Sequence, residues 1–159
     1  MKKVVSNATP IISLAGVEKL PIFNDLFQKV IIPGAVFKEI YLGKYPGYKD
    51  LDSDLFEIQE LGNPEKLDFL LNELDRGESE SILLAKEISA DILIIDERHA
   101  YKIAQSQGLN VIGTLSVLLM AKERGLIKNI KPVLDEMINQ GRWYSKRVYE
   151  YFLMSIGEL

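Results

Sequence analysis

Short apolar runs alternate with longer stretches of amphipathic spacing along this chain. The apolar runs predict strands at residues 3–6, 29–32, 56–61, 92–95 and 111–112. Apolar residues at helical spacing predict helices at residues 10–15, 21–27, 34–42, 64–74, 78–88, 98–107, 115–124, 130–139 and 146–156. Strands that alternate with helices indicate a parallel sheet covered by helices. Ligands in such folds bind beyond the carboxyl ends of the strands, which directs attention to Asn7, Asp96 and Thr114.

Turn and capping residues refine three of these boundaries. Thr9 before Pro10 predicts a helix capped by Thr9, and Thr114 is expected to cap the helix that begins at Leu115. Residues 43–54 are rich in Gly, Pro, Asp and Tyr, and they predict a loop or mobile flap. Because no repeat and no long linker divides the chain, residues 1–159 are expected to form a single domain.

Composition narrows the chemistry. The chain of 159 residues is 47% apolar and 26% charged, which is ordinary for a globular domain. The absence of cysteine excludes disulfides, thiolate zinc sites and a cysteine nucleophile. The single histidine, His99, is interpreted as a surface helix residue, which leaves carboxylate, hydroxyl and lysine chemistry. No targeting segment and no apolar run of about 18 residues is visible, so we expect a cytoplasmic protein without a membrane span.

The charge of the chain is unevenly distributed. A net charge of −4 taken alone argues against a nucleic-acid partner. Between residues 120 and 150, however, the chain has seven basic residues and only four acidic ones. The basic residues are Lys122, Arg124, Lys128, Lys131, Arg142, Lys146 and Arg147. This excess has two interpretations, a solvated helix surface or an edge that faces phosphates.

Five segments of the chain carry a family pattern. They are VVSNATPIISLA from residue 4, KVIIPGAVFKEI from residue 29, RGESESILLA from residue 76, ILIIDERHA from residue 92 and VIGTLSVLLMAKERGLI from residue 111. Their order and spacing resemble the PIN-domain superfamily, and most of all its VapC-like branch, from residue 4 to about residue 130. The resemblance implies an α/β three-layer sandwich, with a central, mostly parallel sheet of about five short strands flanked by helices.

The same resemblance implies a metal site made of oxygen ligands. Its positions fall on Asn7, Glu39, Glu80, Asp96 and the nearby hydroxyl of Thr114, with Glu78 as the alternative to Glu80. Carboxylate and amide oxygens are the ligands that Mg²⁺ or Mn²⁺ prefers, and clustered carboxylates favour a bound cation. The metal polarises a phosphate and lowers the pKa of a bound water.

Each of these residues also has an explanation without catalysis. Asp96 can cap the following helix, and Glu39 can be a solvated surface residue. Glu78 and Glu80 stand in the first turn of a helix, where carboxylates are favoured by the helix dipole. Asn7 can be a turn residue. Asn7 also departs from the family pattern, which usually has aspartate there, and this predicts weaker metal binding and slower hydrolysis.

The activity implied by the resemblance is that of a divalent-metal-dependent endoribonuclease, similar to the toxin of a type II toxin–antitoxin system. A protein antitoxin and a homodimer would then be its partners, and RNA its substrate. Candidate RNA contacts are Arg98, Lys102, Arg142 and Lys146. The alternative function is a catalytically weak or inactive PIN-like module that binds RNA or protein. A receiver-like signalling domain fits less well, because that fold needs paired acids after its first strand, where this chain has Ser6 and Asn7.

Two aromatic residues near the C-terminus stand beside basic ones. Trp143 and Tyr144 lie between Arg142 and Lys146, so their rings can stack on a base. They can equally anchor the last helix on the core, and we favour that interpretation from the sequence.

Overall fold

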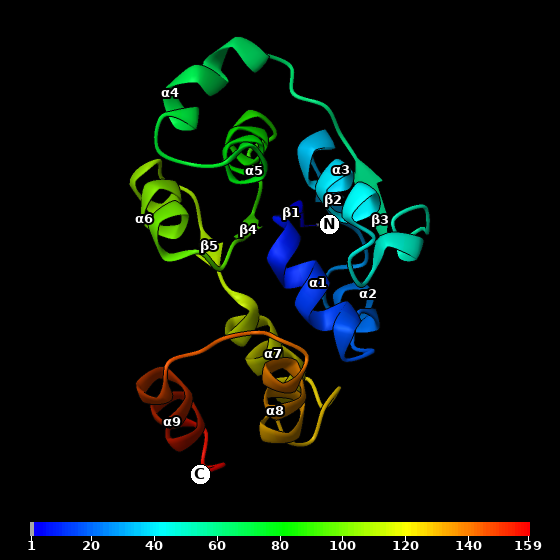
Figure 1. The fold of residues 1–159 in the computed structure, drawn as a ribbon, viewed down its shortest axis with the longest axis vertical. Helices are drawn as coiled ribbons and strands as arrows, with labels where there is room; N and C mark the ends of the chain where they lie inside the picture. Colours follow the sequence, from blue (N-terminus) through cyan, green and yellow to red (C-terminus); the bar gives the residue numbers. More distant parts are fainter. Residues whose placement is uncertain (1) are drawn as a thin grey trace.

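Five short strands form the central sheet of the computed structural model, which describes residues 2–159. They are Val4–Ser6 (β1), Val30–Ile32 (β2), Phe56–Ile58 (β3), Ile92–Ile94 (β4) and Val111–Ile112 (β5). Their order in space is β3-β2-β1-β4-β5, and each neighbouring pair is parallel. β1 therefore lies at the centre, with the chain winding to one side through β2 and β3 and to the other through β4 and β5 (Figure 1). Ligand sites form at such a reversal.

Nine α-helices accompany the sheet within residues 2–159. They are Ala8–Gly16 (α1), Pro21–Phe27 (α2), Gly34–Gly43 (α3), Leu67–Leu71 (α4), Arg76–Glu87 (α5), Arg98–Ser106 (α6), Thr114–Glu123 (α7), Lys131–Asn139 (α8) and Lys146–Ser155 (α9). Two 3₁₀ helices, Tyr48–Asp50 and Pro64–Lys66, lie in the connections. Each helix of this described range is too short or too polar to cross a membrane. The expected α/β sandwich around a parallel sheet is confirmed.

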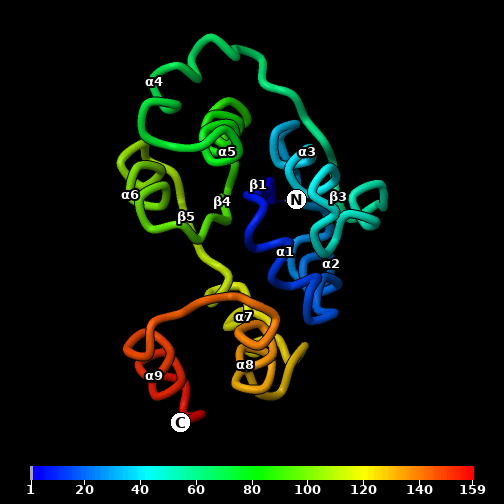
Figure 2. The backbone as a smooth tube through the Cα atoms, in the orientation of Figure 1, coloured from blue at the N-terminus to red at the C-terminus, as the bar shows by residue number. Residues whose placement is uncertain are grey.

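Alternation along the strands divides the core into two layers. Val5, Ile31 and Leu93 are paired across the sheet, and they pack with α4, α5 and α6. The intervening residues of the same strands, such as Val4 and Ile92, pack with α1, α2 and α7. Figure 2 shows the two helical layers on opposite sides of the strands. The strands are apolar on both faces because helices cover both.

The last two helices extend the second of these layers. Leu134 of α8 and Leu153 of α9 are fully buried in the same cluster as α1 and α7. Glu158 holds the end of the chain in place, because its carboxylate accepts hydrogen bonds from the backbone N–H of Ile130 at 2.9 Å and of Lys131 at 2.8 Å. Lys122 of α7 donates to the same carboxylate at 2.6 Å. A side chain thus satisfies backbone donors at the start of α8.

Several predicted helix boundaries are wrong. α1 begins at Ala8 rather than after Thr9, and α7 begins at Thr114 itself with Gly113 as its N-cap. The predicted helix at 64–74 is a 3₁₀ turn followed by α4, which ends at Leu71. The predicted loop at 43–54 is irregular apart from one 3₁₀ helix, but Leu51 within it is buried in the core. Local propensity specifies helix ends only weakly, so the predicted ends differ from the observed ones.

We predict that Glu158→Gln destabilises the protein at neutral pH by about 1.5–3 kcal/mol, the range for hydrogen bonds to charged groups. Burial raises the pKa of the Glu158 carboxyl, but the hydrogen bonds from Ile130, Lys122 and Lys131 outweigh burial and lower the pKa. A lowered pKa stabilises the fold above the ordinary pKa of a glutamate, and this stability is lost as the pH falls through the lowered value. Urea unfolding of both proteins from neutral to acidic pH should therefore show the difference shrinking. A difference independent of pH would contradict this account.

Candidate functional site

Three polar residues follow the carboxyl ends of adjacent strands. Asn7 follows β1, Asp96 lies two residues beyond β4, and Thr114 follows β5. The backbone N–H of Asn7 donates to the carbonyl of Ile94 at 2.9 Å, which continues the pairing of β1 with β4. Carboxyl ends of parallel strands share one edge of the sheet, so the topology brings these three residues to the same edge, as the sequence predicts.

The Asp96 carboxylate is fixed by the start of α7. Its Oδ1 accepts a hydrogen bond from the Thr114 backbone N–H at 2.7 Å, and its Oδ2 accepts one from the Thr114 hydroxyl at 2.5 Å. The explanation of Asp96 as the cap of the next helix is wrong, because Glu97 caps α6 by accepting from the backbone N–H groups of His99 and Ala100. Asp96 instead joins the end of β4 to the first residue of α7.

A glycine allows this close approach. A Cβ atom added at Gly113 would lie 2.8 Å from the Asp96 Oδ1 atom, which is closer than real Cβ contacts come. Any larger residue at position 113 therefore has to displace the Asp96 side chain. The Gly113-Thr114 pair supplies both the space for the carboxylate and the hydrogen bonds that hold it.

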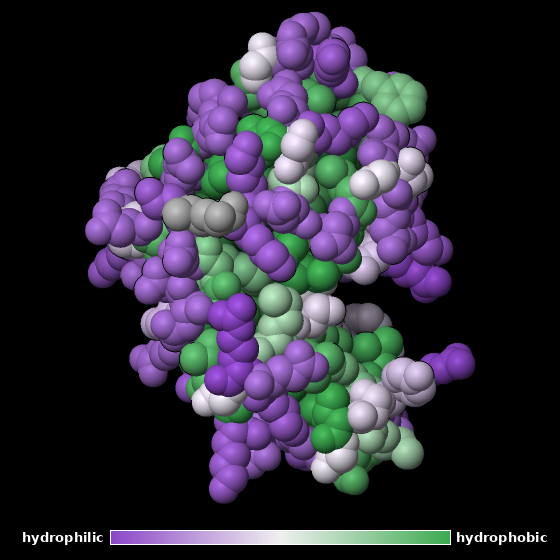
Figure 3. Space-filling model, turned by 180° about the vertical axis from the view of Figure 1, so that it is seen from behind, coloured by the Kyte–Doolittle hydropathy of each residue, from purple (hydrophilic) through white to green (hydrophobic). Residues whose placement is uncertain are grey.

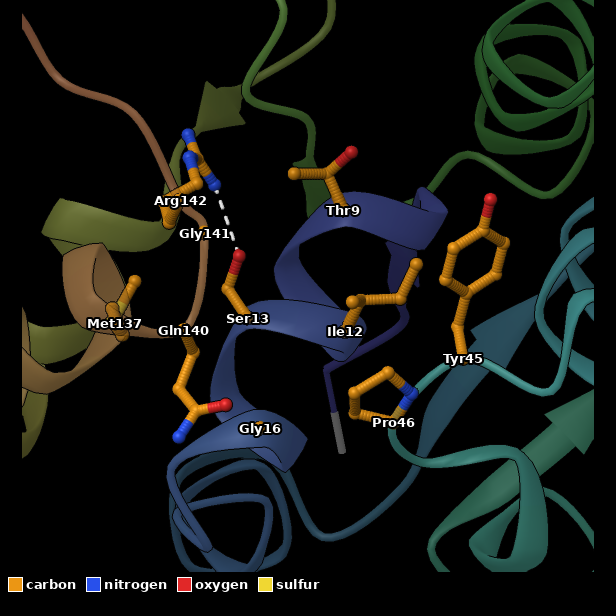
Figure 4. Close-up of a pocket in the computed structure, with 10 residues that line it drawn as sticks. All are labelled: Thr9, Ile12, Ser13, Gly16, Tyr45, Pro46, Met137, Gln140, Gly141 and Arg142. Carbon is orange, nitrogen blue, oxygen red and sulfur yellow. Dashed lines mark hydrogen bonds between the residues drawn. The ribbon is translucent and has the colours of Figure 1, made fainter.

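Arg142 neutralises the same carboxylate from the segment between α8 and α9. Its Nη1 atom lies 2.8 Å from the Asp96 Oδ2 atom and 3.1 Å from the Ser13 hydroxyl of α1, the second contact being drawn in Figure 4. Its guanidinium lies over the Tyr144 ring, 4.6 Å from the ring centre. Only 18% of the Arg142 side chain and 9% of the Asp96 side chain are exposed. Arg142, a predicted RNA contact, thus has an internal partner in this structure.

Figure 4 also shows a hollow on the other side of Arg142. Its volume is about 340 Å³, and it lies between α1, the loop after α3 and the end of α8. It is lined by Thr9, Ile12, Ser13, Gly16, Tyr45, Pro46, Met137, Gln140, Gly141 and Arg142.

An acidic cluster, which we define as Glu39, Asp75, Glu78 and Glu97, lies near the same edge. Glu39 is an exposed residue of α3, as its surface alternative expected, yet partial burial of its carboxyl raises its pKa, and the charge of Asp75 raises it further. Burial also raises the pKa of Glu78, as do the charges of Asp75, Glu97 and Glu39, although a hydrogen bond from the Asp75 backbone N–H opposes the rise. Glu39 lies on α3, Asp75 and Glu78 at the start of α5, and Glu97 is the N-cap of α6, so the fold gathers like charges from distant parts of the chain.

Helix capping orients Glu78 within this cluster. The Asp75 carboxylate accepts from the Glu78 backbone N–H at 2.8 Å, and the Glu78 carboxylate accepts from the Asp75 backbone N–H at 3.2 Å. This reciprocal pair is a capping box with aspartate as N-cap. The spacing D-R-G-E was readable in the sequence, but Asp75 was not singled out as a site residue.

Asn7 lies beside the start of α5. Its Oδ1 atom is 3.4 Å from the position that a Cβ atom would take at Gly77. Asn7 is 6% exposed, and its side chain does not cap α1 although the residue occupies the N-cap position. The Asn7 side chain therefore does not cap the helix that follows it. Its amide oxygen lies against α5, the helix that carries Glu78.

Glu80 has different partners from Glu78. One of its oxygens accepts from the Ala35 backbone N–H in the first turn of α3 at 3.1 Å, and the other accepts from the Arg76 Nε atom at 2.8 Å. Both contacts tie α5 to α3 and to its own first turn. Of the two candidate ligands at the start of α5, Glu78 is the one whose pKa is raised by the charges of Asp75, Glu97 and Glu39.

The carboxylate and amide oxygens of these residues are the kind of ligand that a hard divalent cation prefers. In this structure, however, the side chains do not converge on one point. Within residues 2–159, no three His, Cys, Asp or Glu side chains are grouped so that they could hold a metal ion. Partial burial is the main cause of the raised pKa values of Glu39 and Glu78, neighbouring carboxylates add to the rise, and a bound cation would offset both effects. A shared metal shell needs these side chains to turn toward one another and Asp96 to share its Oδ2 atom with Arg142.

The remaining predicted residues lie around this edge. Arg98 lines a groove beside Asp96, and Lys102 is exposed on α6. Lys146 is exposed at the start of α9, 3.8 Å from Glu150. His99 is an exposed helix residue, as predicted, and contacts Glu73 at 3.1 Å. The anchoring role expected of both aromatic residues is right for Tyr144, which packs on the core, and wrong for Trp143, which is 77% exposed.

Comparison with known proteins agrees with this architecture. A protein-family model described as a PIN domain matches residues 3–158, which is nearly the whole chain. This match confirms the resemblance carried by the five sequence segments and extends it over the two C-terminal helices. The VapC-like branch stays a prediction. None of the curated proteins compared with the chain matches it.

We predict that Glu39→Gln stabilises the protein at neutral pH, because it removes one charge from the acidic cluster. A carboxyl whose pKa is raised by folding favours the fold when protonated, and this stability is lost as the pH rises through the raised value. The gain from glutamine should therefore be largest near pH 7 and vanish below the ordinary pKa of glutamate, about 4.3. Thermal unfolding across this pH range measures it. Glu65→Gln, in the exposed 3₁₀ helix Pro64–Lys66, is the control, and an equal effect there would refute the prediction.

Proposed function

The chain belongs to the PIN domain family, and from that premise we propose that it is a divalent-metal-dependent endoribonuclease. PIN domains are generally nucleases and bind RNA. The observation that carries the proposal is the acidic cluster, in which Glu39 and Glu78 have raised pKa values at the carboxyl edge of the sheet. Like charges brought together by three separate elements destabilise a fold unless a cation offsets them, so their presence supports a metal-dependent role.

Four residues are proposed to hold the metal, Mg²⁺ or Mn²⁺. They are Glu39, Glu78, Asp96 and, through its amide oxygen, Asn7. Glu78 takes the place that the sequence alone assigned by preference to Glu80, because the charges of Asp75, Glu97 and Glu39 act on Glu78, whereas Glu80 is held by Ala35 and Arg76. The bound metal supplies charge stabilisation to a phosphate and lowers the pKa of a water.

The other residues act by orienting these oxygens. The backbone N–H and the hydroxyl of Thr114 hold the Asp96 carboxylate in one orientation. Asp75 does the same for Glu78 through the capping box. Ligands fixed by such outer hydrogen bonds lose less conformational freedom when they bind. Arg142 places a positive charge beside Asp96, where it can meet the negative charge of an RNA phosphate.

The biological role that we propose is that of a toxin in a type II toxin–antitoxin system. It rests on the resemblance to the VapC-like branch, and it implies a cytoplasmic protein, a protein antitoxin and a homodimer. A second candidate function is an RNA- or protein-binding module without catalysis. Two observations favour it: asparagine at position 7, and the ion pair between Arg142 and Asp96 that occupies an oxygen of the site.

Cleavage of single-stranded RNA by the purified protein tests the proposal. We expect cleavage with Mg²⁺ or Mn²⁺ and none with EDTA. Asp96→Asn and Glu78→Gln should each lower the rate by about 100-fold or more, the scale for losing one electrostatic contributor to a transition state. Glu80→Gln is the matched control in the same helix and should retain most of the activity. Folding of each variant is checked by thermal unfolding.

Two outcomes would contradict the assignment. If Glu80→Gln abolishes cleavage while Glu78→Gln does not, the ligand at the start of α5 is misassigned. If the folded wild-type protein binds RNA but never cleaves it with either metal, the binding module is the correct function.

Asn7→Asp tests the cost of the amide in the site. Aspartate restores the charge usual in the family, so we expect tighter Mn²⁺ binding by calorimetry and faster cleavage. The added carboxylate also lies beside the acidic cluster, so the variant without metal should unfold at a lower temperature. Saturation with Mn²⁺ should reverse this loss, since a ligand at about 100 times its Kd stabilises by about 2.7 kcal/mol. Unchanged Mn²⁺ affinity would place Asn7 outside the metal shell.

A further inference from the structure

The segment between α8 and α9 displays one exposed tryptophan from a firmly held backbone. Arg142 is bound to Asp96, and the Tyr144 ring packs under its guanidinium. The Ser145 hydroxyl accepts from the Val148 backbone N–H at 3.1 Å and caps α9. Between these anchors, Trp143 is 77% exposed. The backbone that carries the exposed ring is therefore anchored on both sides, and Trp143 does not belong to the hydrophobic core.

Trp143 lines a groove that begins at Asp96. The groove has a volume of about 800 Å³, and α6 and the start of α9 form two of its sides. Its lining residues are Ile95, Asp96, Glu97, Arg98, Tyr101, Gly113, Leu115, Ser116, Arg142, Trp143, Tyr144, Ser145 and Val148. In Figure 3, a notch in the outline separates the mostly hydrophilic upper part of the molecule from the lower part, where hydrophobic side chains gather.

A second hollow continues the groove along α9. It measures about 460 Å³ and shares Leu115 and Val148 with the first. Tyr151, which is also 77% exposed, lies in its lining together with the exposed Arg147. The path from Asp96 along α9 thus passes two exposed aromatic rings, with Arg98 and Arg147 beside it.

We propose that this groove binds single-stranded RNA, with one base stacked on the Trp143 ring. Every base offers a π-face, so an exposed aromatic ring can hold unpaired bases without sequence readout. Arg98 and Arg147 can meet the phosphates that connect such bases. The inference rests on the proposed function in one respect, since it takes Asp96 at the start of the groove as part of the cutting site.

The lining favours unpaired RNA over other occupants. Bases within a duplex are stacked on one another and cannot lie flat on a side chain. The groove combines its aromatic rings with arginines at both hollows, a combination that single-strand sites use to hold bases and phosphates together. Because RNA is strongly negative, the arginines complement it, while the acidic residues lie at the end of the groove where a metal is proposed.

The chain itself carries a probe for this contact. Trp143 is its one tryptophan, so the intrinsic tryptophan fluorescence reports on this groove alone. We expect a single-stranded oligouridine of about 12 nucleotides, a length within the range of single-strand sites, to quench this emission in EDTA. A blunt RNA duplex of the same length should quench it less. EDTA prevents metal-dependent cleavage, so binding is measured apart from catalysis.

Variants then measure the contribution of the ring. By fluorescence anisotropy of labelled oligouridine, Trp143→Ala should weaken binding by about tenfold or more, as expected for one stacked base. Trp143→Phe should recover part of this loss because it keeps an aromatic face. Phe69→Ala is the matched control, since Phe69 on α4 is 75% exposed but outside the groove.

The outcomes separate this inference from the proposed function. Unchanged affinity and unchanged emission overturn the stacking site, even if Asp96-dependent cleavage is observed. Quenching with a tenfold loss in Trp143→Ala supports the stacking site, even if no cleavage is found. If Trp143→Ala leaves RNA affinity unchanged but shifts the protein to a smaller species in size-exclusion chromatography, the groove binds a second copy of the chain and the RNA proposal fails.

Discussion

The carboxylate of Asp96 is the point on which the candidate site depends. It accepts two hydrogen bonds from Thr114 and one from Arg142, which also contacts Ser13. These contacts join the end of β4, the start of α7, α1 and the segment before α9, which are remote in sequence. A buried carboxylate is costly unless it is paired and hydrogen-bonded, and these partners meet that requirement. Loss of the Asp96 carboxylate would remove a proposed metal ligand. It would also release the segment that displays Trp143.

The acidic cluster poses the opposite problem, because its members repel one another. Partial burial raises the pKa values of Glu39 and Glu78, and the charge of Asp75 close to both adds to the rise. The protein tolerates this arrangement because α5 is capped by the same Asp75 and packed through a large apolar face. Strain of this kind gathers at functional sites, where charge that weakens the fold is used to bind a cation.

The acidic cluster and the contacts around Arg142 lie at different ends of this edge of the sheet. The acidic cluster and Asn7 lie at α3 and the starts of α5 and α6, whereas Arg142 and the aromatic groove lie toward α9. An RNA strand bound along the groove would have its phosphates attracted by arginines and its cleaved bond near the carboxylates. Asn7 and the Arg142–Asp96 ion pair lower the negative charge of this edge. The ion pair means that the Asp96 carboxylate already has an internal partner in this structure.

The sequence by itself determined the elements and their order. All five strands were predicted, although the run 56–61 is a strand only over Phe56–Ile58, because short runs rich in β-branched residues between turn residues favour strands. The parallel sheet followed from the alternation with helices, and Asn7, Asp96 and Thr114 followed from their positions after strands. The segment order also placed the chain in its family. These inferences succeeded because they depend on local pattern and chain order.

Only the tertiary structure decided which side chains meet. Glu78 and Glu80 stand two residues apart in one helix turn; local spacing pairs Glu80 with Arg76, but only packing against α3 brings Glu80 to the Ala35 backbone N–H. Asp96 is 46 residues from Arg142, a separation across which no local pattern specifies a contact. Trp143 and Tyr144 are adjacent aromatic residues, yet Trp143 is exposed and Tyr144 packs on the core. Helix packing sets which residue faces inward, and that depends on every neighbouring element at once.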